Sequence, residues 1–350
     1  MDHELPSISV IVTTYNEGKT IGAMLRNTVD LNYPGERLEI LVVDGASTDE
    51  TRKIVQQYTD DRRVRLVTQE SRSGWNSGVQ EGVDRANGDV IVLSGADVFY
   101  DRDAITRLCS HFGDPQVGAV TGRQLLFNSD ETFATQMERE YRRSQDFVSV
   151  AESILDQPFD VKGEIVAVRK WIMNEAIERT GKAFGTQDAW TGTLDACVAF
   201  ETKAQGKKLI FEPEATYSEY TPTSMRERLR MQVHRGKVLI ESTSSYLWMI
   251  YKPRFGKFGM LIFPYHLAML TLMPWVFLAG LGCVSLAALA NPLYMLVFTP
   301  AILVAFTNRG RIFLCSFALA QVSLVRAMLL IATRKTSPIK RIESTRRLPN

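Results

Sequence analysis

The sequence is poor in the residues that usually build metal centres and disulfide frameworks. It has only four cysteines and four histidines in 350 residues, and no two cysteines form a Cys-x-x-Cys pair. This usage indicates neither a zinc site nor a disulfide framework. Net charge is also scarce, at +2, so the bulk electrostatics give no reason to expect nucleic acid as a partner.

Charge is missing altogether from one long stretch towards the C-terminus. Residues 258–308 contain no Asp, Glu, Lys or Arg, and one spanning helix needs about 20 apolar residues, so we expect two helices and a tight connection. A third apolar stretch follows at 312–333. Two full spans would return the chain to the side of residues 1–257, as the positive-inside rule favours. A third full span would carry the basic tail away from that side, so the number and parity of the spans stay open.

Before this stretch, short apolar runs alternate with amphipathic segments. The runs are rich in β-branched residues and predict strands, and the segments between them predict helices. Strand and helix in alternation are typical of a doubly wound parallel sheet. The predicted strands are 8–13, 38–43, 64–67 and 90–93, and the predicted helices are 19–31, 51–58 and 74–86.

The fourth of these strands ends in a single carboxylate. Residues 88–97 read Gly-Asp-Val-Ile-Val-Leu-Ser-Gly-Ala-Asp, and four apolar residues without alternation are typical of a strand buried on both faces. Ligands of open α/β sheets bind beyond the carboxyl ends of the strands. Asp97 is therefore placed where a ligand, or a metal bound to a ligand, would lie. A solvated Asp that caps the next helix fits the same residues.

Polar loops follow three of the predicted strands, at 14–17, 44–49 and 95–97. The crossover rule brings them to one edge of the sheet. Acidic loops that meet there would repel each other, and a divalent cation with a phosphorylated ligand would offset that repulsion. A Rossmann dinucleotide site is the rival, but the required Gly-x-Gly-x-x-Gly is absent, as is a Walker P-loop. We therefore expect phosphates to be bound without a glycine cradle.

Four segments, in this order, resemble the family 2 glycosyltransferases. They read SVIVTTYNE (9–17), ILVVDGASTDET (40–51), RSGWNSG (72–78) and GDVIVLSGAD (88–97), and the resemblance runs from about residue 7 to residue 236. Each segment alone would be weak, but the combination is specific. The resemblance implies a nucleotide-sugar donor and a GT-A type, Rossmann-like α/β fold. Its mostly parallel sheet would be flanked by helices and followed by C-terminal transmembrane helices.

The resemblance also implies which residues bind the donor. In the family, residues after the first and second strands hold the nucleoside, and a basic residue after the third strand faces the diphosphate. The fourth strand ends in an Asp-x-Asp-like metal motif, which reads Gly-Ala-Asp here, so its first carboxylate is missing. Asp97 aligns with the metal ligand proper, which implies Mg²⁺ or Mn²⁺ at this position. The implied donor-binding residues are Thr13, Tyr15, Glu17, Asp44, Arg72 and Asp97.

A second group of motifs resembles the acceptor side of the family. Residues 159–169 are similar to its acceptor-side strand, and residues 193–195, Thr-Leu-Asp, stand where the family has an acidic tripeptide. The resemblance implies that Asp195 removes the proton from the acceptor hydroxyl, about 18 residues before a Pro-Glu-Ala turn at 213–215. A helix-capping Asp is the alternative. The nearest other carboxylates are Asp188 and Glu201.

A basic helix is predicted at 225–236, just before the apolar region. Processive members of the family carry Gln-x-x-Arg-Trp near this point. The chain has Gln232 and Arg235 at that spacing but no Trp, which argues against processivity. The resemblance implies that both residues lie on the diphosphate or acceptor side, where a guanidinium can pair with the leaving diphosphate. Contact of this helix with anionic lipid is a second interpretation, compatible with the first.

Together these patterns predict a membrane-anchored, inverting glycosyltransferase of the hexosyltransferase type. Its donor would be a nucleotide-diphosphate sugar, and its acceptor a lipid-linked sugar or a growing glycan. A processive polysaccharide synthase is one alternative, and a non-catalytic nucleotide-sugar-binding scaffold subunit is another. We expect a multi-pass membrane protein with a cytoplasmic catalytic domain. The predicted parts are a GT-A domain (1–224), basic juxtamembrane helices (225–257), a membrane region of two to three helices (258–333) and a basic tail (334–350).

Overall fold

An eight-stranded mixed sheet organises the computed structural model, which describes residues 4–184, 194–333 and 342–349. The strand order is β3-β2-β1-β4-β7-β6-β8-β5. Most pairs are parallel, but β7 runs antiparallel to both of its neighbours, and β5 to β8. The expected mostly parallel α/β sheet is confirmed. The strands are β1 (Ile8–Thr14), β2 (Leu38–Asp44), β3 (Val64–Thr68), β4 (Val90–Gly95), β5 (Phe99–Tyr100), β6 (Val117–Leu126), β7 (Val166–Arg169) and β8 (Lys208–Glu219).

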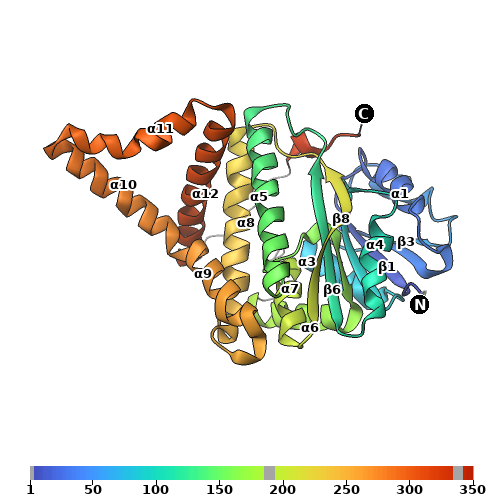
Figure 1. Cartoon of the computed structure of the whole chain (residues 1–350). Helices are drawn as coiled ribbons and strands as arrows, with labels where there is room; N and C mark the ends of the chain where they lie inside the picture. The colour runs from blue at the N-terminus through green and yellow to red at the C-terminus, as the bar shows by residue number, and fades with distance from the viewer. Residues whose placement is uncertain (1–3, 185–193, 334–341, 350) are drawn as a thin grey trace.

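Helices cover both faces of this sheet (Figure 1). Side chains alternate along β1, so Val10 and Val12 enter the core on one face and Ile11 enters the core on the other. This burial on both faces explains why the strand has no polar alternation. The covering helices are α1 (Ile21–Val29), α2 (Thr51–Gln56), α3 (Trp75–Arg85), α4 (Ala104–Ser110), α6 (Lys170–Phe184) and α7 (Leu194–Ala204).

Strand β8 contains a bulge where the sequence predicted a turn. The register between β6 and β8 shifts after Phe211, so residues 212–215 bulge opposite Gly122. The predicted turn at 213–215 is corrected to a bulge inside the strand, because β8 pairs with β6 on both sides of it. Pro213, which has no N–H to donate, falls in the unpaired part.

Replacing Gly122 with Ala is expected to lower the free energy of unfolding by about 1–3 kcal/mol. A Cβ at this position would lie 2.3 Å from the carbonyl oxygen of Ala215, so one of the two strands would have to shift. Gly181→Ala is the matched control, because nothing lies within 4 Å of its added Cβ and Ala favours the helix. Thermal unfolding checks this, and equal midpoints for the two variants would contradict it.

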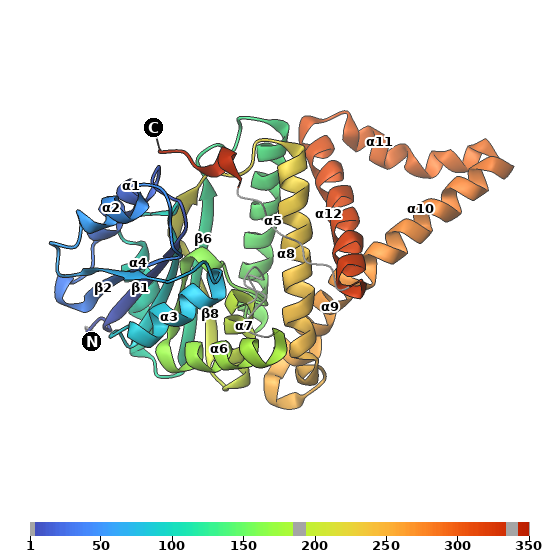
Figure 2. The same cartoon turned by 180° about the vertical axis from the view of Figure 1, so that it is seen from behind.

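Three long helices, α5, α8 and α12, lie side by side next to the sheet, and α10 and α11 project from them as an arm (Figure 1, Figure 2). One face of α12 packs on α8 and buries Gln321 and Ser323. The predicted apolar stretch at 312–333 is therefore partly covered by protein. The helices are α5 (Phe133–Leu155), α8 (Met225–Ser245), α9 (Phe263–Thr271), α10 (Met273–Ala290), α11 (Thr299–Ala305) and α12 (Asn308–Ala332).

Two helices of the described residues, α10 and α12, are long and apolar enough to cross a membrane. The sequence predicted two such helices within 258–308, and that prediction is corrected, because α10 alone has the length there. A proline stands in the first turn of each helical segment from α9 to α11. Since proline cannot continue a preceding helix, the second half of the stretch is divided into a 3-10 segment, Pro292–Phe298, and the seven-residue α11.

The strand predicted at 159–169 is shorter in the structure. Of residues 159–169, only Val166–Arg169 (β7) pairs with the sheet, and a 3-10 turn, Gly163–Ile165, precedes it. Phe159 instead stacks on His266 of α9, with the ring centroids 4.0 Å apart. Phe159 is thus buried in the core on one face of the sheet and not paired within it, so the predicted strand is corrected to its last four residues.

Candidate active site

The loops after β1 and β2 meet at one edge of the sheet, as expected. Asn16 N–H donates to Ser47 Oγ (2.9 Å), and Thr48 N–H donates to Asn16 Oδ1 (2.8 Å). Each loop also holds a non-glycine residue with positive φ, Asn16 at 56° and Ala46 at 60°. Such backbone conformations are uncommon and gather at functional sites. The two loops are therefore joined by hydrogen bonds beyond the strand ends, and each contains a residue in an uncommon backbone conformation.

Two buried side chains from the first two strands line this edge. Asp44 is fully buried, and its Oδ2 accepts from Ser47 N–H (3.0 Å) and lies 3.5 Å from Arg52 Nε. Within the described part of the chain, its Oδ1 has no hydrogen-bond partner, and neither has Thr14 Oγ1. Buried polar atoms are normally satisfied, so these two indicate a place for a ligand's polar groups. Thr13 lies next to them, against α3, where a Cβ at Gly78 would stand 3.1 Å from its Cγ2.

Tyr15 and Arg72 stack on each other although they follow different strands. The guanidinium carbon of Arg72 lies 4.0 Å from the centroid of the Tyr15 ring. A cation–π contact of this kind restrains an exposed arginine without burying its charge. The two residues that the sequence assigned to the nucleoside and the diphosphate are thus neighbours at the rim of the edge.

Glu164 lies beside Gly95, the position at which the resembled Asp-x-Asp-like motif has its first carboxylate. A Cβ at Gly95 would lie 2.8 Å from Glu164 Oε2 and 3.2 Å from Asp97 Oδ1. Glu164 thus brings a carboxylate to the side of Gly95, close to Asp97. Burial raises the pKa of Glu164 well above its usual value, and the charges of Glu219, Asp97 and Asp195 raise it further.

Asp195 stands in the first turn of α7, close to the 3-10 turn before β7. A Cβ at Gly163 would lie 2.5 Å from Asp195 Oδ2, so only glycine leaves room for the carboxylate. Burial, and then the charge of Asp160, raises the pKa of Asp195 to about 7, and Arg235 opposes that rise. A carboxylate with a pKa near neutrality is suited to act as a general base. Its Oδ1 also accepts from the N–H of the next residue, Ala196 (2.9 Å), but α7 begins at Leu194, so Asp195 stands inside the helix and not at its N-cap.

Of the two alternative bases, Glu201 and Asp188, the structure describes only Glu201. Glu201 is fully buried, and its Oε2 accepts from Arg179 Nε (2.7 Å) and from Tyr246 OH (3.0 Å). These contacts join α7 to neighbouring elements and give Glu201 a structural role. Asp188 lies outside the described residues.

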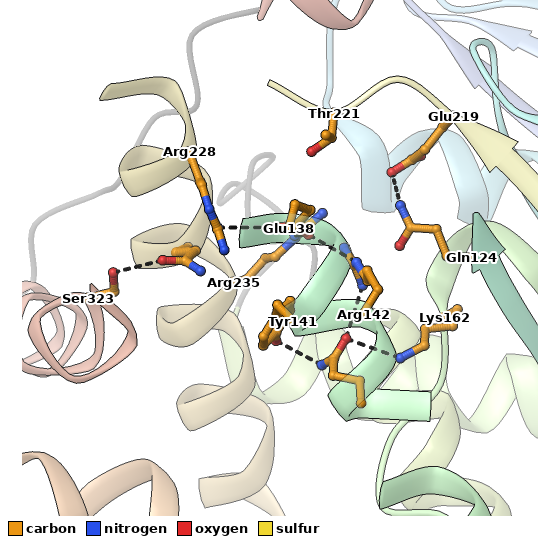
Figure 3. Close-up of polar contacts among 12 residues, drawn as sticks. Gln124, Glu138, Tyr141, Arg142, Lys162, Glu219, Thr221, Arg228, Arg235 and Ser323 are labelled. Carbon is orange, nitrogen blue, oxygen red and sulfur yellow. Dashed lines mark hydrogen bonds and ion pairs between the residues drawn. The ribbon is translucent and has the colours of Figure 1, made fainter. Parts of the chain in front are cut away.

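A buried charged cluster joins α8 to α5 (Figure 3). Glu138 on α5 is 1% exposed and pairs with Arg142 at 3.0 Å, Arg228 at 3.1 Å and Arg235 at 2.9 Å. Burial alone would raise the pKa of Glu138, but the three guanidiniums lower it to about 2. A buried carboxylate with this many partners stays ionised. The cluster thereby holds Arg235, which is partly exposed, near the candidate base.

Gln232 lies about one turn before Arg235 on α8 and contacts both the charged cluster and α12. Its amide is 3.5 Å from Ser323 Oγ of α12, and with its oxygen turned towards Arg228 it accepts from that guanidinium at 2.9 Å. These contacts place Gln232 in the α8–α12 interface. Its predicted role on the diphosphate or acceptor side stays a prediction.

Residues 9–170 match the family model described as Glycosyl transferase family 2. The chain carries a family 2 glycosyltransferase domain. The structure of mannosyltransferase PcManGT from Pyrobaculum calidifontis, in complex with GDP-Man and Mn²⁺, has a TM-score of 0.76 and 25% identity. That match covers 95% of this chain and 89% of the other.

Curated relatives of the glycosyltransferase domain cover less of the chain. The poly-beta-1,6-N-acetyl-D-glucosamine synthase of Staphylococcus aureus is 23% identical over 242 residues, which are 68% of this chain and 56% of that protein. The probable glycosyltransferase YdaM of Bacillus subtilis is 33% identical over 138 residues, or 38% of this chain and 33% of that one. The chain spans about half the length, or less, of these relatives.

Glu164 of the glycosyltransferase domain was missed by sequence reasoning. It lies far from Asp97 in sequence, on a 3-10 turn that the sequence suggested was part of a strand. The charges of Asp97 and Asp195 both raise the pKa of Glu164, so this side chain lies near both carboxylates. The only available signal was the missing carboxylate at Gly95, which indicates that a replacement is needed but not where it lies.

Proposed function

We propose that this chain is an inverting glycosyltransferase that moves a hexosyl group from a nucleotide-diphosphate sugar to an acceptor at a membrane. The observation that carries the proposal is the meeting of Asp97, Glu164 and Asp195 at the end of β4 and the start of α7. Asp97, at one end of this set of three carboxylates, adjoins the edge of the sheet where the loops after β1 and β2 meet, which we call the donor edge. Asp195, at the other end, is a candidate base with a pKa of about 7. Both halves of a transfer reaction are therefore supplied within one site.

The residues present fit a divalent cation that arrives with its substrate. Within the described ranges, no group of three or more His, Cys, Asp or Glu side chains could hold a metal unaided. Asp97 and Glu164 offer two carboxylates near one point, and Mg²⁺ is commonly bound by one or two carboxylates together with substrate phosphates. Asp97, with Glu164 beside it, would hold Mg²⁺ or Mn²⁺. The bound ion would stabilise the negative charge that develops on the leaving nucleoside diphosphate.

The side chains of the donor edge would bind and orient the nucleotide. Asp44 Oδ1 would accept a hydrogen bond from the nucleoside, and the Thr14 hydroxyl would donate or accept one. Tyr15 and Glu17 would lie beside the nucleoside. Arg72, held over the Tyr15 ring, would face the diphosphate and supply charge-assisted hydrogen bonds. These interactions fix the anomeric carbon in place, which is the main requirement for transfer between two bound reactants.

Asp195 would remove the proton from the acceptor hydroxyl. The hydroxyl oxygen then attacks the anomeric carbon from the face opposite the diphosphate. A carbon–oxygen bond to the acceptor forms while the bond to the phosphate oxygen breaks, and the configuration inverts. Arg235, placed near Asp195 by the Glu138 cluster, would hold the acceptor or the departing diphosphate.

The donor and acceptor classes are proposed from the relatives and from the helices. PcManGT was solved with GDP-Man and Mn²⁺ and matches nearly the whole chain, so GDP-mannose is the first donor to test. The apolar helices α10 and α12 would place the acceptor, a lipid-linked sugar or a growing glycan, at the membrane surface. Residues 342–349 contact the catalytic sheet, so a multi-pass arrangement would need an even number of crossings, with the catalytic domain in the cytoplasm.

A processive polysaccharide synthase is the second candidate, because the Staphylococcus aureus relative is named as one. Product length separates the two proposals. A single added sugar per acceptor supports simple transfer, whereas a ladder of long products formed before the acceptor is exhausted supports processivity. A non-catalytic scaffold subunit is disfavoured because Glu164 restores a carboxylate beside Gly95.

A donor screen with the purified full chain tests the proposal. Calorimetry with GDP-mannose and UDP-N-acetylglucosamine, each with and without Mn²⁺, should show metal-dependent binding of one donor. Slow hydrolysis or transfer of the bound sugar should accompany it. Metal-dependent binding without turnover would indicate a scaffold, and the absence of binding by nucleotide sugars of either base would overturn the proposal.

Transfer is expected to rise with pH through about 7. Burial and Asp160 raise the pKa of Asp195 to about 7, and only the ionised carboxylate can accept a proton. Well below pH 7, kcat should therefore fall about ten-fold per pH unit, while above it the rate should level off. The profile is measured at saturating donor and Mn²⁺, and a rate that is constant across neutral pH would contradict the assignment.

A further inference from the structure

The end of the chain lies across the donor edge. Residues 342–349 follow α12, which packs on the opposite side of α8 and α5, yet the C-terminus is found beside the sheet near α1 (Figure 1). The tail from 334 to 350 is strongly basic, with six Lys or Arg residues and one Glu. The edge that it meets is acidic, so charge complementarity favours the contact.

Several contacts anchor this segment, which we call the strap (residues 342–349). Ser344 Oγ donates to Glu227 Oε2 at 2.9 Å, and Arg347 Nη1 donates to both carboxylate oxygens of Glu131 at 2.9 Å. Tyr220 OH donates to the Leu348 carbonyl oxygen at 2.9 Å. These partners lie at the start of α8, before α5 and after β8, so three separate parts of the chain hold the strap.

Between these anchors, Arg346 enters the acidic site. Its guanidinium forms an ion pair with Glu17 and lies 3.5 Å from Asp97 Oδ2. The side chain is only 19% exposed. Its charge also opposes the rise in the pKa of Glu164. One cation from the chain therefore stands among three carboxylates assigned to the donor and its metal.

We propose that the strap is an intramolecular competitor of the donor. Arg346 occupies Glu17 and Asp97 in the closed state, so the metal–nucleotide complex binds only after the guanidinium has left. This inference rests on the proposed function, because it takes the donor edge to be the nucleotide site. The competitor is part of the same chain, so its effective concentration is set by the anchors at Glu227, Glu131 and Tyr220.

Electrostatics explain why the two occupants exclude each other. With the site empty of nucleotide, the carboxylates would repel each other, and the guanidinium offsets that repulsion. A divalent cation at Asp97 supplies the same positive charge and needs the same carboxylate. Arg346 and the cation would then repel each other over a short distance. If the strap is closed in about 90% of molecules, the apparent donor affinity is weakened about ten-fold.

Calorimetry on the full chain tests the competition directly. GDP and UDP, each with Mn²⁺, are titrated into the wild-type chain and into Arg346→Ala, Arg347→Ala and Arg107→Ala. We expect Arg346→Ala to bind the nucleotide about ten-fold more tightly, and Arg347→Ala to show a smaller gain because it loses an anchor. Arg107→Ala is the control for lost positive charge, since its guanidinium pairs with Glu214 on the surface, and it should match the wild type.

The direction in which Arg346→Ala changes nucleotide affinity tests the inference. Weaker binding by Arg346→Ala would mean that the arginine clamps the nucleotide, and unchanged binding would mean that it has no part in the site; either overturns the inference. If none of the four proteins binds GDP or UDP, the proposed function itself fails, which is a different pattern. Hydrogen exchange gives a second readout: exchange in 342–350 of the wild type should increase with saturating Mn²⁺–nucleotide, and a decrease or no change overturns the strap.

Discussion

Replacing Asp195 with Asn is expected to lower sugar transfer by about 10²–10⁴-fold while donor affinity stays almost unchanged. The carboxylate acts on the acceptor hydroxyl in the transition state, so its loss belongs in turnover and not in donor binding. Burial gives this group a pKa of about 7, which suits a base at neutral pH. Single-turnover transfer at saturating donor, beside donor calorimetry on the same protein, measures the two quantities separately.

The same substitution separates catalysis from a local role at the start of α7. The side-chain oxygen of Asn can accept from Ala196 N–H as that of Asp does, so a residue with this role alone would tolerate the change. Glu201→Gln is the matched control, because it alters a carboxylate of the same helix that pairs with Arg179 and Tyr246. Its cost should appear in thermal stability. Transfer by Asp195→Asn within about three-fold of wild type would leave only the local contact with Ala196.

Replacing Asp97 with Asn is expected to abolish Mn²⁺-dependent donor binding and leave the fold intact. The side chain is partly exposed at the end of β4, so the core does not depend on it. An amide oxygen is a weaker ligand than a carboxylate for a hard cation, so the neighbouring Glu164 would be left to hold the ion together with the nucleotide phosphates. Donor calorimetry with and without Mn²⁺, together with a thermal unfolding scan, measures both parts of the prediction.

Glu164→Gln is measured in the same way, and its expected loss of affinity is smaller than that of Asp97→Asn. It keeps the shape of the side chain beside Gly95 and removes one of the two carboxylates proposed to hold the ion, so we expect a partial loss of metal-dependent affinity. Unchanged donor affinity of Asp97→Asn in Mn²⁺ would place the cation elsewhere. A full loss with Glu164→Gln and no loss with Asp97→Asn would assign the ion to Glu164 instead.

The first half of the fold could be predicted from the sequence because its signals are local. Strands buried on both faces leave unbroken apolar runs, as in 8–13 and 90–93, and those runs became β1 and β4. Parallel strands end at one edge of the sheet, so the sequence alone predicted that Tyr15, Asp44 and Asp97 lie at the same edge. The family 2 glycosyltransferase domain followed from the same segments.

The C-terminal half was predicted less well because its signals compete. Hydropathy alone indicated two spans within 258–308, but prolines divided that stretch into short helices, and only α10 is long enough there. The Pro-Glu-Ala turn stayed inside β8 because both of its flanks pair with β6. In each case a backbone constraint or a pairing partner overrode the local pattern.

The sequence by itself determined the class of fold, the edge where the strand-end loops meet and the family, since each depends on residues within one strand and the loop that follows it. Only the tertiary structure decided that Glu164 stands beside Gly95, that Gln232 contacts α12, and that Arg346 lies between Glu17 and Asp97. These contacts join residues far apart in the chain. Charge and shape decide such contacts once the backbone has brought the residues together, and no periodicity in a single sequence records them.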